Sequence, residues 1–310
     1  MGGSGGGGFL YGSSPQKAAQ QIRSVEEKTK SDSYRINVAS LLGNLLVAAN
    51  SRDTETVQRH LSGIEAAVHK GIEGFIDLRY AGSVAKHTYV DGLSDIDSLA
   101  IINECELVDH TPDKVKQYFY EQISGRLPNT DVTIGKLAVT IKFSSGFEIQ
   151  ILPAIKDAQG IRIPSSRRDN EWSHIIKPDN FAKLLRYTNA QMSGKLVPVV
   201  KLAKSIISSF PESRKLSGYH VESLAIEVFA NYTGEKRPQQ MLKHFFTEGA
   251  KCVLSPVKDK TGQSVHVDDY LGTANSVNRK MVSDSMSTIA RKMQNADGSE
   301  EIRIWEQIVN

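Results

Sequence analysis

The sequence has few cysteines, little excess charge and no long hydrophobic run. Its 310 residues include two cysteines, Cys105 and Cys252, which excludes a disulfide framework and argues against a cysteine-based zinc site. No apolar segment approaches the roughly 20 residues that a membrane-spanning helix needs. Residues 1–8 are nearly all glycine and lack the basic and apolar regions of a secretory signal. We therefore expect a cytoplasmic protein.

Positive and negative side chains almost balance. Lys and Arg number 38 against 35 Asp and Glu, which gives a net charge of +3. This balance tolerates a polyanionic partner but does not require one. Apolar residues make up 39% of the chain and charged residues 24%, as in globular proteins, and the length allows about two domains.

The hydrophobic pattern changes twice along the chain. Residues 1–15 are predicted to form a flexible glycine-rich tail, either a linker or a natural terminus. Helical spacing follows up to about residue 74, with an apolar stripe that includes Ile36 and Leu42. Strands are predicted at 76–80 and 96–102 and in a hairpin over 137–152, with a helix at 113–126 between them. From about residue 181 the pattern is helical again.

These patterns predict an α+β protein with two parts. Residues 16–190 would hold the N-terminal helices and a small mixed sheet with flanking helices, and residues 191–310 would form a helical C-terminal domain.

One short segment carries most of the chemical information: Gly82-Ser83, eleven further residues, then Asp95-Ile96-Asp97. Alternate residues of a strand point to the same face, so Asp95 and Asp97 project together while Ile96 faces the core. Adjacent carboxylates repel unless a cation or proton lies between them, and Mg²⁺ takes oxygen ligands. Gly82 lets a phosphate approach the backbone, and Ser83 adds a hydroxyl donor. Together these features suit a nucleoside triphosphate and its metal.

This segment resembles the signature of the DNA polymerase beta-like nucleotidyltransferase superfamily. The longer stretches 80–99, 267–275 and 289–297 are similar to the bacterial oligonucleotide cyclases of CBASS anti-phage systems, the cyclic GMP-AMP synthase and DncV-like group. The resemblance implies a polymerase beta-like core and an oligoadenylate synthetase-like helical domain, bilobal with a central cleft. It also implies two Mg²⁺ ions, or Mn²⁺, as cofactors and nucleoside triphosphates as substrates.

The family places a third carboxylate on a neighbouring strand, here within residues 147–153. Two registers compete, because Glu148 matches one spacing to Pro153 that occurs in the family and Gln150 matches another. Both positions share one strand face. Only Glu148 is anionic, so we predict it as the third metal ligand beside Asp95 and Asp97, with Gln150 as the alternative.

The second half of the chain supplies candidates for the donor triphosphate. Residues 201–204 followed by 217–220 are similar to a lysine and a Ser-Tyr-His pattern of the cyclic GMP-AMP synthase group, where a lysine and a serine hold the triphosphate. The resemblance assigns this role to Lys201 and Ser217, with Lys204 as second choice and Gly218 as an alternative to the serine. Lys201 and Lys204 are three residues apart, so we expect them to share a helix face away from the apolar stripe. Tyr219 is a candidate for stacking on a base.

Two further features are interpreted as structural. Asp268 and Asp269 are adjacent in a predicted loop, where neighbouring side chains diverge, so we expect a turn or helix cap there and no metal site. His220 is expected to be structural or exposed, without a role in the chemistry.

The sequence thus predicts a nucleotidyltransferase. A ribose hydroxyl would attack the α-phosphorus of a nucleoside triphosphate at Asp95, Asp97 and Glu148, and pyrophosphate would leave. The resemblance implies that repetition in one pocket yields a cyclic di- or trinucleotide second messenger for anti-phage signalling. It further implies a regulatory protein partner or phage-derived activator, with no membrane and no stable DNA or RNA complex.

Two alternatives remain. The same chemistry could act on an RNA 3′ end, a protein or a small molecule, although an RNA-tailing enzyme is expected to carry a broader basic face than a net charge of +3 provides. The chain could instead be a catalytically inactive nucleotide- or partner-binding module, and Gln150 is the residue that keeps this alternative open.

Overall fold

The computed structural model describes residues 15–51, 53–70, 75–90, 96–103, 105–165, 168–260 and 266–309. Asp95, one of the predicted metal ligands, lies outside these ranges, and so does the predicted tail up to residue 14.

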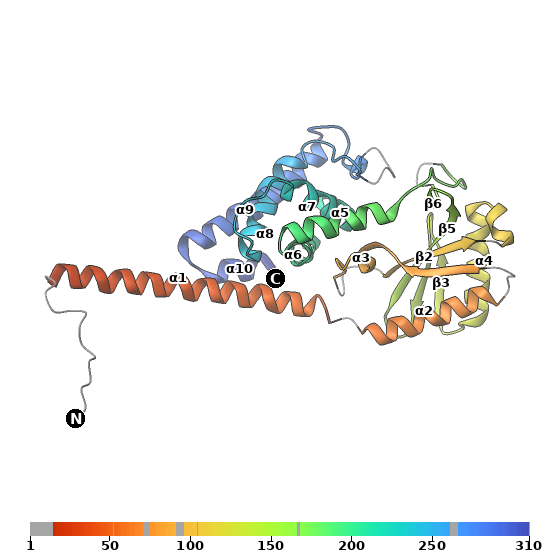
Figure 1. Ribbon diagram of the computed structural model, residues 1–310, viewed down its shortest axis with the longest axis horizontal. Coiled ribbons are helices and arrows are strands. Elements are labelled where there is room, and N and C mark those ends of the chain that lie inside the picture. The colour runs from red at the N-terminus through yellow and green to blue at the C-terminus, as the bar shows by residue number, and fades with distance from the viewer. Residues whose placement is uncertain are drawn as a thin grey trace, which may run out of the picture.

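Within the described residues, six strands form one mixed sheet (Figure 1). The sheet order is β1-β2-β5-β4-β3, with β6 paired to β5, and β2 and β5 run parallel while the other pairs are antiparallel. The strands are β1 (Phe75–Tyr80), β2 (Ile96–Asn103), β3 (Thr130–Ile134), β4 (Val139–Phe143), β5 (Glu148–Asp157) and β6 (Gly160–Arg162). Buried and half-buried residues alternate strictly along β2, so one face of this strand packs in the core while Asp97 lies on the other.

Two helices cover the face of the sheet that lies opposite the Asp97 face of β2. α2 (Thr54–His69) and α4 (Pro112–Arg126) contribute buried apolar side chains to the cluster that contains the inward residues of β1, β2, β4 and β5. The Asp53 carboxylate accepts a hydrogen bond from the Thr56 amide (3.0 Å) and so caps the start of α2. The short helix α3 (Gly82–Ala85) follows β1, and η1 (Glu106–Asp109) precedes α4. We call this part of the molecule the sheet lobe.

The C-terminal part is helical and has its own apolar core. It contains α5 (Pro178–Gln191), α6 (Leu196–Ser208), α7 (Gly218–Phe229), α8 (Pro238–Cys252), α9 (Val277–Ser299) and α10 (Ile302–Val309), with the short turns η2 (Glu212–Arg214) and η3 (Asp269–Leu271). We call it the helical lobe. The predicted boundary between residues 190 and 191 falls at the end of α5, which packs in this same cluster.

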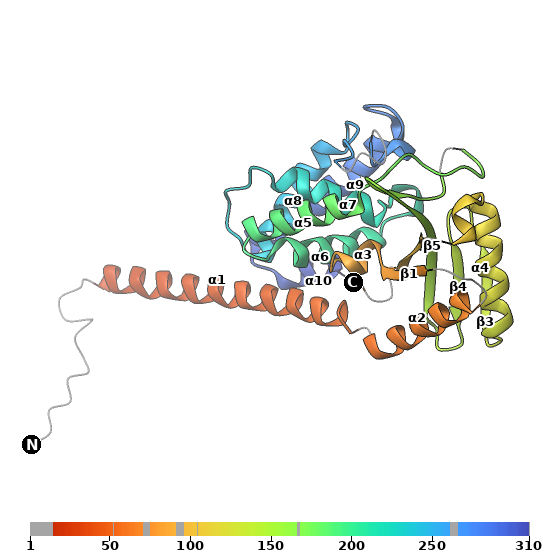
Figure 2. The same cartoon turned by 45° about the vertical axis from the view of Figure 1, so that its right-hand side comes forward.

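The N-terminal helix α1 (Pro15–Ala48) joins the two lobes. It runs along the helical lobe and leads directly into α2 of the sheet lobe (Figures 1 and 2). Tyr34, Val38 and Leu42 form its buried stripe, whereas Ile36 is 68% exposed, so the predicted stripe was wrong at that residue. The Tyr34 hydroxyl donates to Asp297 (2.9 Å) and accepts from the indole of the fully buried Trp305 (2.8 Å), which ties α1 to the C-terminal helices.

None of the helices in the described ranges combines the length and the apolar character that crossing a membrane requires.

Candidate active site

The predicted phosphate turn lies directly against one of the predicted metal ligands. Gly82 adopts φ +51°, and a Cβ atom built on it would lie 1.9 Å from Asp97 Oδ2 and 2.7 Å from Asp97 Cγ. The Ala81 amide donates to the Asp97 carbonyl oxygen (2.8 Å), which holds the turn on β2. Glycine is therefore required at position 82 both by the backbone conformation and by the space that the carboxylate occupies. The structure brings Gly82, Ser83 and Asp97 together, and their roles as phosphate turn and metal ligand stay predictions.

The Ser83 hydroxyl is buried. Ser83 is 9% exposed, and its Oγ has no hydrogen-bond partner among the described residues. Its carbonyl oxygen, in contrast, accepts from the amides of Thr88 (2.9 Å) and Tyr89 (3.1 Å), so the turn itself is fixed. A buried hydroxyl without a partner is costly, and a phosphate oxygen would satisfy it. The donor set of Ser83 and Asp97 thus fits a metal-bound triphosphate.

The third predicted ligand lies on β5. In the parallel register Asp97 pairs with Gln150, while Glu148 begins β5 two residues earlier. Glu148 Oε2 lies 3.3 Å from Lys142 Nζ on β4, and its side chain is 34% exposed. The choice between Glu148 and Gln150 stays a prediction. The part of the chain that the structure describes contains no cluster of three His, Cys, Asp or Glu side chains suited to a metal ion, and Asp95 is not included in that part.

The two candidate lysines of α6 point to different places. Lys204 is 8% exposed, and its ammonium donates to the Thr88 carbonyl oxygen (3.0 Å) and to Glu222 Oε1 (2.8 Å). A Cβ atom built on Gly218 would lie 3.3 Å from Lys204 Nζ, so Lys204 reaches the start of α7. The expectation that Lys201 and Lys204 share one face away from the apolar stripe was wrong, because Lys204 is buried between α3, α6 and α7.

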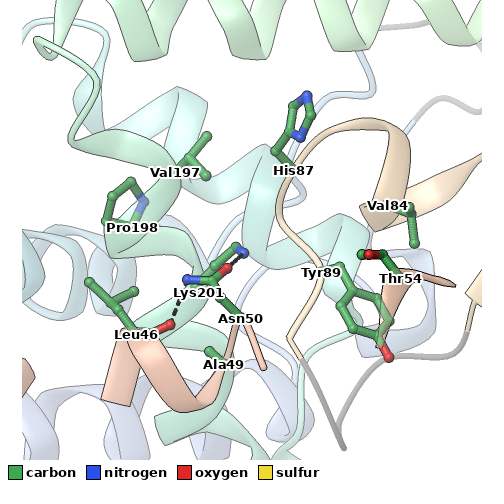
Figure 3. A pocket seen from close by; sticks show the side chains of 10 residues that line it. All are labelled: Leu46, Ala49, Asn50, Thr54, Val84, His87, Tyr89, Val197, Pro198 and Lys201. Atoms are coloured by element: carbon green, nitrogen blue, oxygen red, sulfur yellow. Dashed lines mark hydrogen bonds between the residues drawn. The ribbon is translucent and has the colours of Figure 1, made fainter. Parts of the chain in front are cut away.

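Lys201 faces the end of α1 instead. Its ammonium contacts Asn50 Oδ1, and Asn50 Nδ2 donates to the Leu46 carbonyl oxygen (2.5 Å) (Figure 3). Lys201 lines a cavity of about 370 Å³ together with residues from α1, α2, α3 and α6 and from the loop after α3. Val84 and Tyr89 lie across this cavity from Val197 and Pro198 (Figure 3).

Ser217 and Tyr219 both have protein partners. Ser217 caps α7, since its Oγ accepts from the His220 amide (3.2 Å). The Tyr219 hydroxyl donates to Asp259 Oδ1 (3.0 Å), and its ring packs on Phe181 with a centroid distance of 4.7 Å. Base stacking by Tyr219 and triphosphate binding by Ser217 stay predictions.

Sequence reasoning missed Glu222 and Lys86. Glu222 is 1% exposed on α7 and contacts Lys86, Lys204 and Thr88. A charged residue within the apolar run 221–229 was the available signal for Glu222. Lys86 had no such signal, because residues 83–90 form a short helix and a loop and no apolar run surrounds the lysine in the sequence.

Behind the start of α7 lies a buried group of polar side chains. His220 is completely buried, its Nδ1 lies 2.9 Å from the Tyr270 hydroxyl, and its Nε2 lies 3.6 Å from Asp268 Oδ2. Asp268 also pairs with the fully buried Arg279, whose Nη1 lies 2.7 Å from Asp268 Oδ2. The pair at 268–269 is therefore structural, as expected: Asp268 forms a buried ion pair and Asp269 begins η3. Burial lowers the pKa of His220 to about 4, with Asp268 raising it and Arg279 lowering it to smaller extents.

Acidification should destabilise the protein through His220. The pKa of His220 is about 4 in the folded protein and 6.5 in the unfolded chain. As the pH falls, His220 is therefore protonated in the unfolded state first. The free energy of unfolding is therefore unaffected by His220 above pH 6.5 and falls by about 3 kcal/mol between pH 6.5 and pH 4. Urea unfolding at pH 7 and pH 4.5 should show this loss in the wild type and a smaller loss in His220→Gln. Equal losses in the two proteins would contradict the assignment.

No protein-family model matches the sequence, and no curated protein matches it either. Solved structures do match. The chain is similar to the CD-NTase CdnG from Bradyrhizobium diazoefficiens, solved in complex with GTP, with a TM-score of 0.64 and 14% identity over 88% of this chain and 98% of that one.

Two further solved structures are similar over most of their length. One is the Vibrio cholerae DncV cyclic AMP-GMP synthase in complex with a linear intermediate, with a TM-score of 0.63 and 8% identity over 95% of this chain and 89% of that one. The other is CdnC from E. coli MS115-1 in its HORMA-deltaN complex, with a TM-score of 0.57 and 16% identity over 85% and 91%. These likenesses confirm the predicted fold, a small mixed sheet with flanking helices joined to a helical C-terminal part.

Proposed function

We propose that the protein is a nucleotidyltransferase that joins nucleoside triphosphates into a cyclic di- or trinucleotide. The observation that carries this proposal is the contact of the Asp97 carboxylate with Gly82, beside the Ser83 hydroxyl, which has no hydrogen-bond partner in the part of the chain that the structure describes. It occurs in a fold that the DncV cyclic AMP-GMP synthase also has. Cyclic products and an anti-phage signalling role extend this proposal and rest on the likeness to the cyclases.

The residues divide the work as follows. Asp95, Asp97 and Glu148 would hold two Mg²⁺ or Mn²⁺ ions, which when bound activate the acceptor hydroxyl and neutralise developing negative charge. Ser83 donates its buried hydroxyl to a phosphate oxygen of the donor, and Gly82 leaves room for the Asp97 carboxylate beside that phosphate.

Positive charge comes from α6. Burial lowers the pKa of Lys204, and Glu222 and Asp97 offset part of that shift. Lys204 reaches the start of α7 at Gly218. Lys201 and Ser217 remain the further candidates for the triphosphate. Positioning and electrostatics of this kind supply most of the acceleration in phosphoryl-group chemistry.

A regulatory protein partner is part of the proposal. CdnC, one of the similar proteins, was solved in a complex with HORMA-deltaN, and the similarity covers 85% of this chain. We propose that this protein acts in the cytoplasm, because two partly buried free cysteines suit a reducing compartment. Nucleoside triphosphates are the proposed substrates.

Product analysis tests the function directly. The protein is incubated with ATP, GTP, CTP and UTP and with Mg²⁺ or Mn²⁺, without nucleic acid, and the mixture is treated with phosphatase. We expect a phosphatase-resistant cyclic di- or trinucleotide by mass spectrometry, together with pyrophosphate. Product that appears only when RNA or another acceptor is added would replace the cyclase by a transferase to that acceptor. Nucleotide binding without any product would favour the inactive binding module, for which Gln150 beside Asp97 is the supporting observation.

A further inference from the structure

A single buried carboxylate joins the two lobes next to the candidate site. Glu222 of α7 is 1% exposed. Its Oε1 accepts from Lys204 of α6 (2.8 Å) and from the Thr88 hydroxyl, and its Oε2 pairs with Lys86. Lys86 and Thr88 belong to the sheet lobe, where Lys86 ends α3, while Glu222 and Lys204 belong to the helical lobe.

The contacts of Glu222 continue into the phosphate turn. The Thr88 amide donates to the Ser83 carbonyl oxygen (2.9 Å), and the Thr88 carbonyl oxygen accepts from Lys204 Nζ (3.0 Å). Thr88 is completely buried. A displacement of Glu222 would therefore be transmitted through one residue, Thr88, to the turn that carries Ser83.

Lys86 is held from a second side. Its ammonium lies 5.0 Å from the centre of the Phe181 ring on α5 and 5.3 Å from that of Tyr219 on α7. These distances are within the range of cation–π attraction. Lys86 thus binds Glu222 and faces two aromatic rings, all three from the helical lobe.

The charges make this arrangement sensitive to Glu222. The buried Lys204 and the half-buried Lys86, whose side chain is 12% exposed, share one carboxylate. Removing the carboxylate leaves two ammonium groups close together without compensation, which is strongly unfavourable. Burial by itself would raise the pKa of Glu222, but Lys86 and Lys204 hold it below its ordinary value, so the carboxylate stays charged. Burial lowers the pKa of Lys204, and Glu222 and Asp97 offset part of that shift while Lys86 adds to it.

We propose that Glu222 is a positioning residue that fixes the Gly82–Ser83 turn of the sheet lobe against α6 and α7 and keeps Lys86 and Lys204 beside the donor triphosphate. The fixing of the turn follows from contacts within the protein, whereas the effect on the triphosphate rests on the proposed function. Glu222 touches neither substrate nor metal in this scheme; it acts through Thr88, Lys86 and Lys204.

The matched control is Asp297. Its carboxylate also accepts from three side chains, Tyr34 (2.9 Å), Gln239 (2.7 Å) and Lys243 (2.5 Å), but these all lie on α1 and α8 at the far side of the helical lobe. Asp297→Asn should lower overall stability without changing nucleotide binding. Lys86→Met serves as the second test variant, because it leaves the Lys204–Glu222 pair intact and is less prone to unfold than Glu222→Gln.

The first measurement needs no nucleotide. Hydrogen exchange of the free protein should show the amides of Thr88 and Tyr89, which donate to Ser83, exchanging at least about 10-fold faster in Glu222→Gln and in Lys86→Met than in the wild type. Asp297→Asn should leave these amides unchanged. Unchanged exchange in a folded Glu222 or Lys86 variant would overturn the proposed fixing of the turn, whatever the protein does with nucleotides.

The second measurement separates positioning from a general structural role. A non-hydrolysable ATP analogue should bind the Glu222→Gln protein about 10- to 100-fold more weakly, whereas binding of AMP should change less than about 3-fold. Glu222→Asp, which keeps the charge, should recover part of the affinity for the analogue. Equal losses for the analogue and for AMP would overturn the triphosphate role. A wild type that binds no triphosphate would defeat the proposed function and this role together, while the exchange result would still decide the fixing of the turn.

Discussion

Replacing Asp97 by Asn should reduce product formation at least about 1,000-fold. The substitution keeps the size of the side chain but removes the negative charge that would bind the metal ions, and such stabilisation of a phosphoryl transition state is worth several kcal/mol. The fold should tolerate the change, because Asp97 is half-buried and joins the sheet through its backbone, including the bond from the Ala81 amide (2.8 Å). Initial rates of pyrophosphate release, measured beside thermal unfolding, would check both statements.

Asp77→Asn is the matched control for this prediction. Asp77 is also a half-buried aspartate of the sheet, on β1, but its carboxylate accepts from Arg79 Nε (2.6 Å) on the same strand. The control should retain nearly full activity. Activity of Asp97→Asn above about a tenth of the wild type would mean that the reaction does not depend on this carboxylate, and the proposed site would have to be abandoned.

Replacing Gly82 by Ala should lower activity at least about 100-fold. The added methyl group would lie 1.9 Å from Asp97 Oδ2, so the turn or the carboxylate must move, and a misplacement of about 1 Å can cost about 100-fold in rate. The left-handed backbone at φ +51° adds a strain of about 1 kcal/mol for a residue with a side chain. Steady-state kinetics with a nucleoside triphosphate would measure the loss.

Strain and displacement can be separated with Gly146. This glycine lies between β4 and β5 with φ +86°, and nothing lies within 4 Å of a Cβ atom built on it. Gly146→Ala therefore carries comparable backbone strain without any clash. We expect a loss of stability from backbone strain in both alanine variants, a larger one in Gly82→Ala because of the clash, and a large loss of activity in Gly82→Ala alone. Comparable activities of Gly82→Ala and Gly146→Ala would show that the contact between Gly82 and Asp97 does not affect the reaction.

Local patterns predicted the central elements of the sheet lobe well. The strands expected at 76–80 and 96–102 correspond to β1 and β2, the hairpin over 137–152 to β4 and β5, and the helix at 113–126 to α4. Each has a clear apolar period or a turn signal. The strand β3 was not predicted, because its residues are mostly exposed or half-buried and show no buried run. Its pairing with β4 comes from tertiary contact, which a single sequence does not reveal.

The candidate site was predictable where its chemistry is local. Gly82 and Ser83 could be linked to Asp97 because turn, spacing and strand alternation all lie within 16 consecutive residues. The burial of Lys204 could not be predicted in this way. It depends on Glu222, 18 residues away along the chain, and on Thr88, 116 residues away. The pairing of Gln150 with Asp97 likewise depends on a register between distant strands.

The Tyr270 hydroxyl links the short turn η3 to the start of α7. It accepts from the Ser217 amide (3.3 Å) and lies 2.9 Å from His220 Nδ1, while the segment that carries it is anchored by the buried Asp268–Arg279 pair. Under the proposed function, substitutions around residue 270 would alter product formation without touching a nucleotide. Variation among homologues in this stretch would then be a means of tuning turnover, and libraries for engineering altered enzymes should include it.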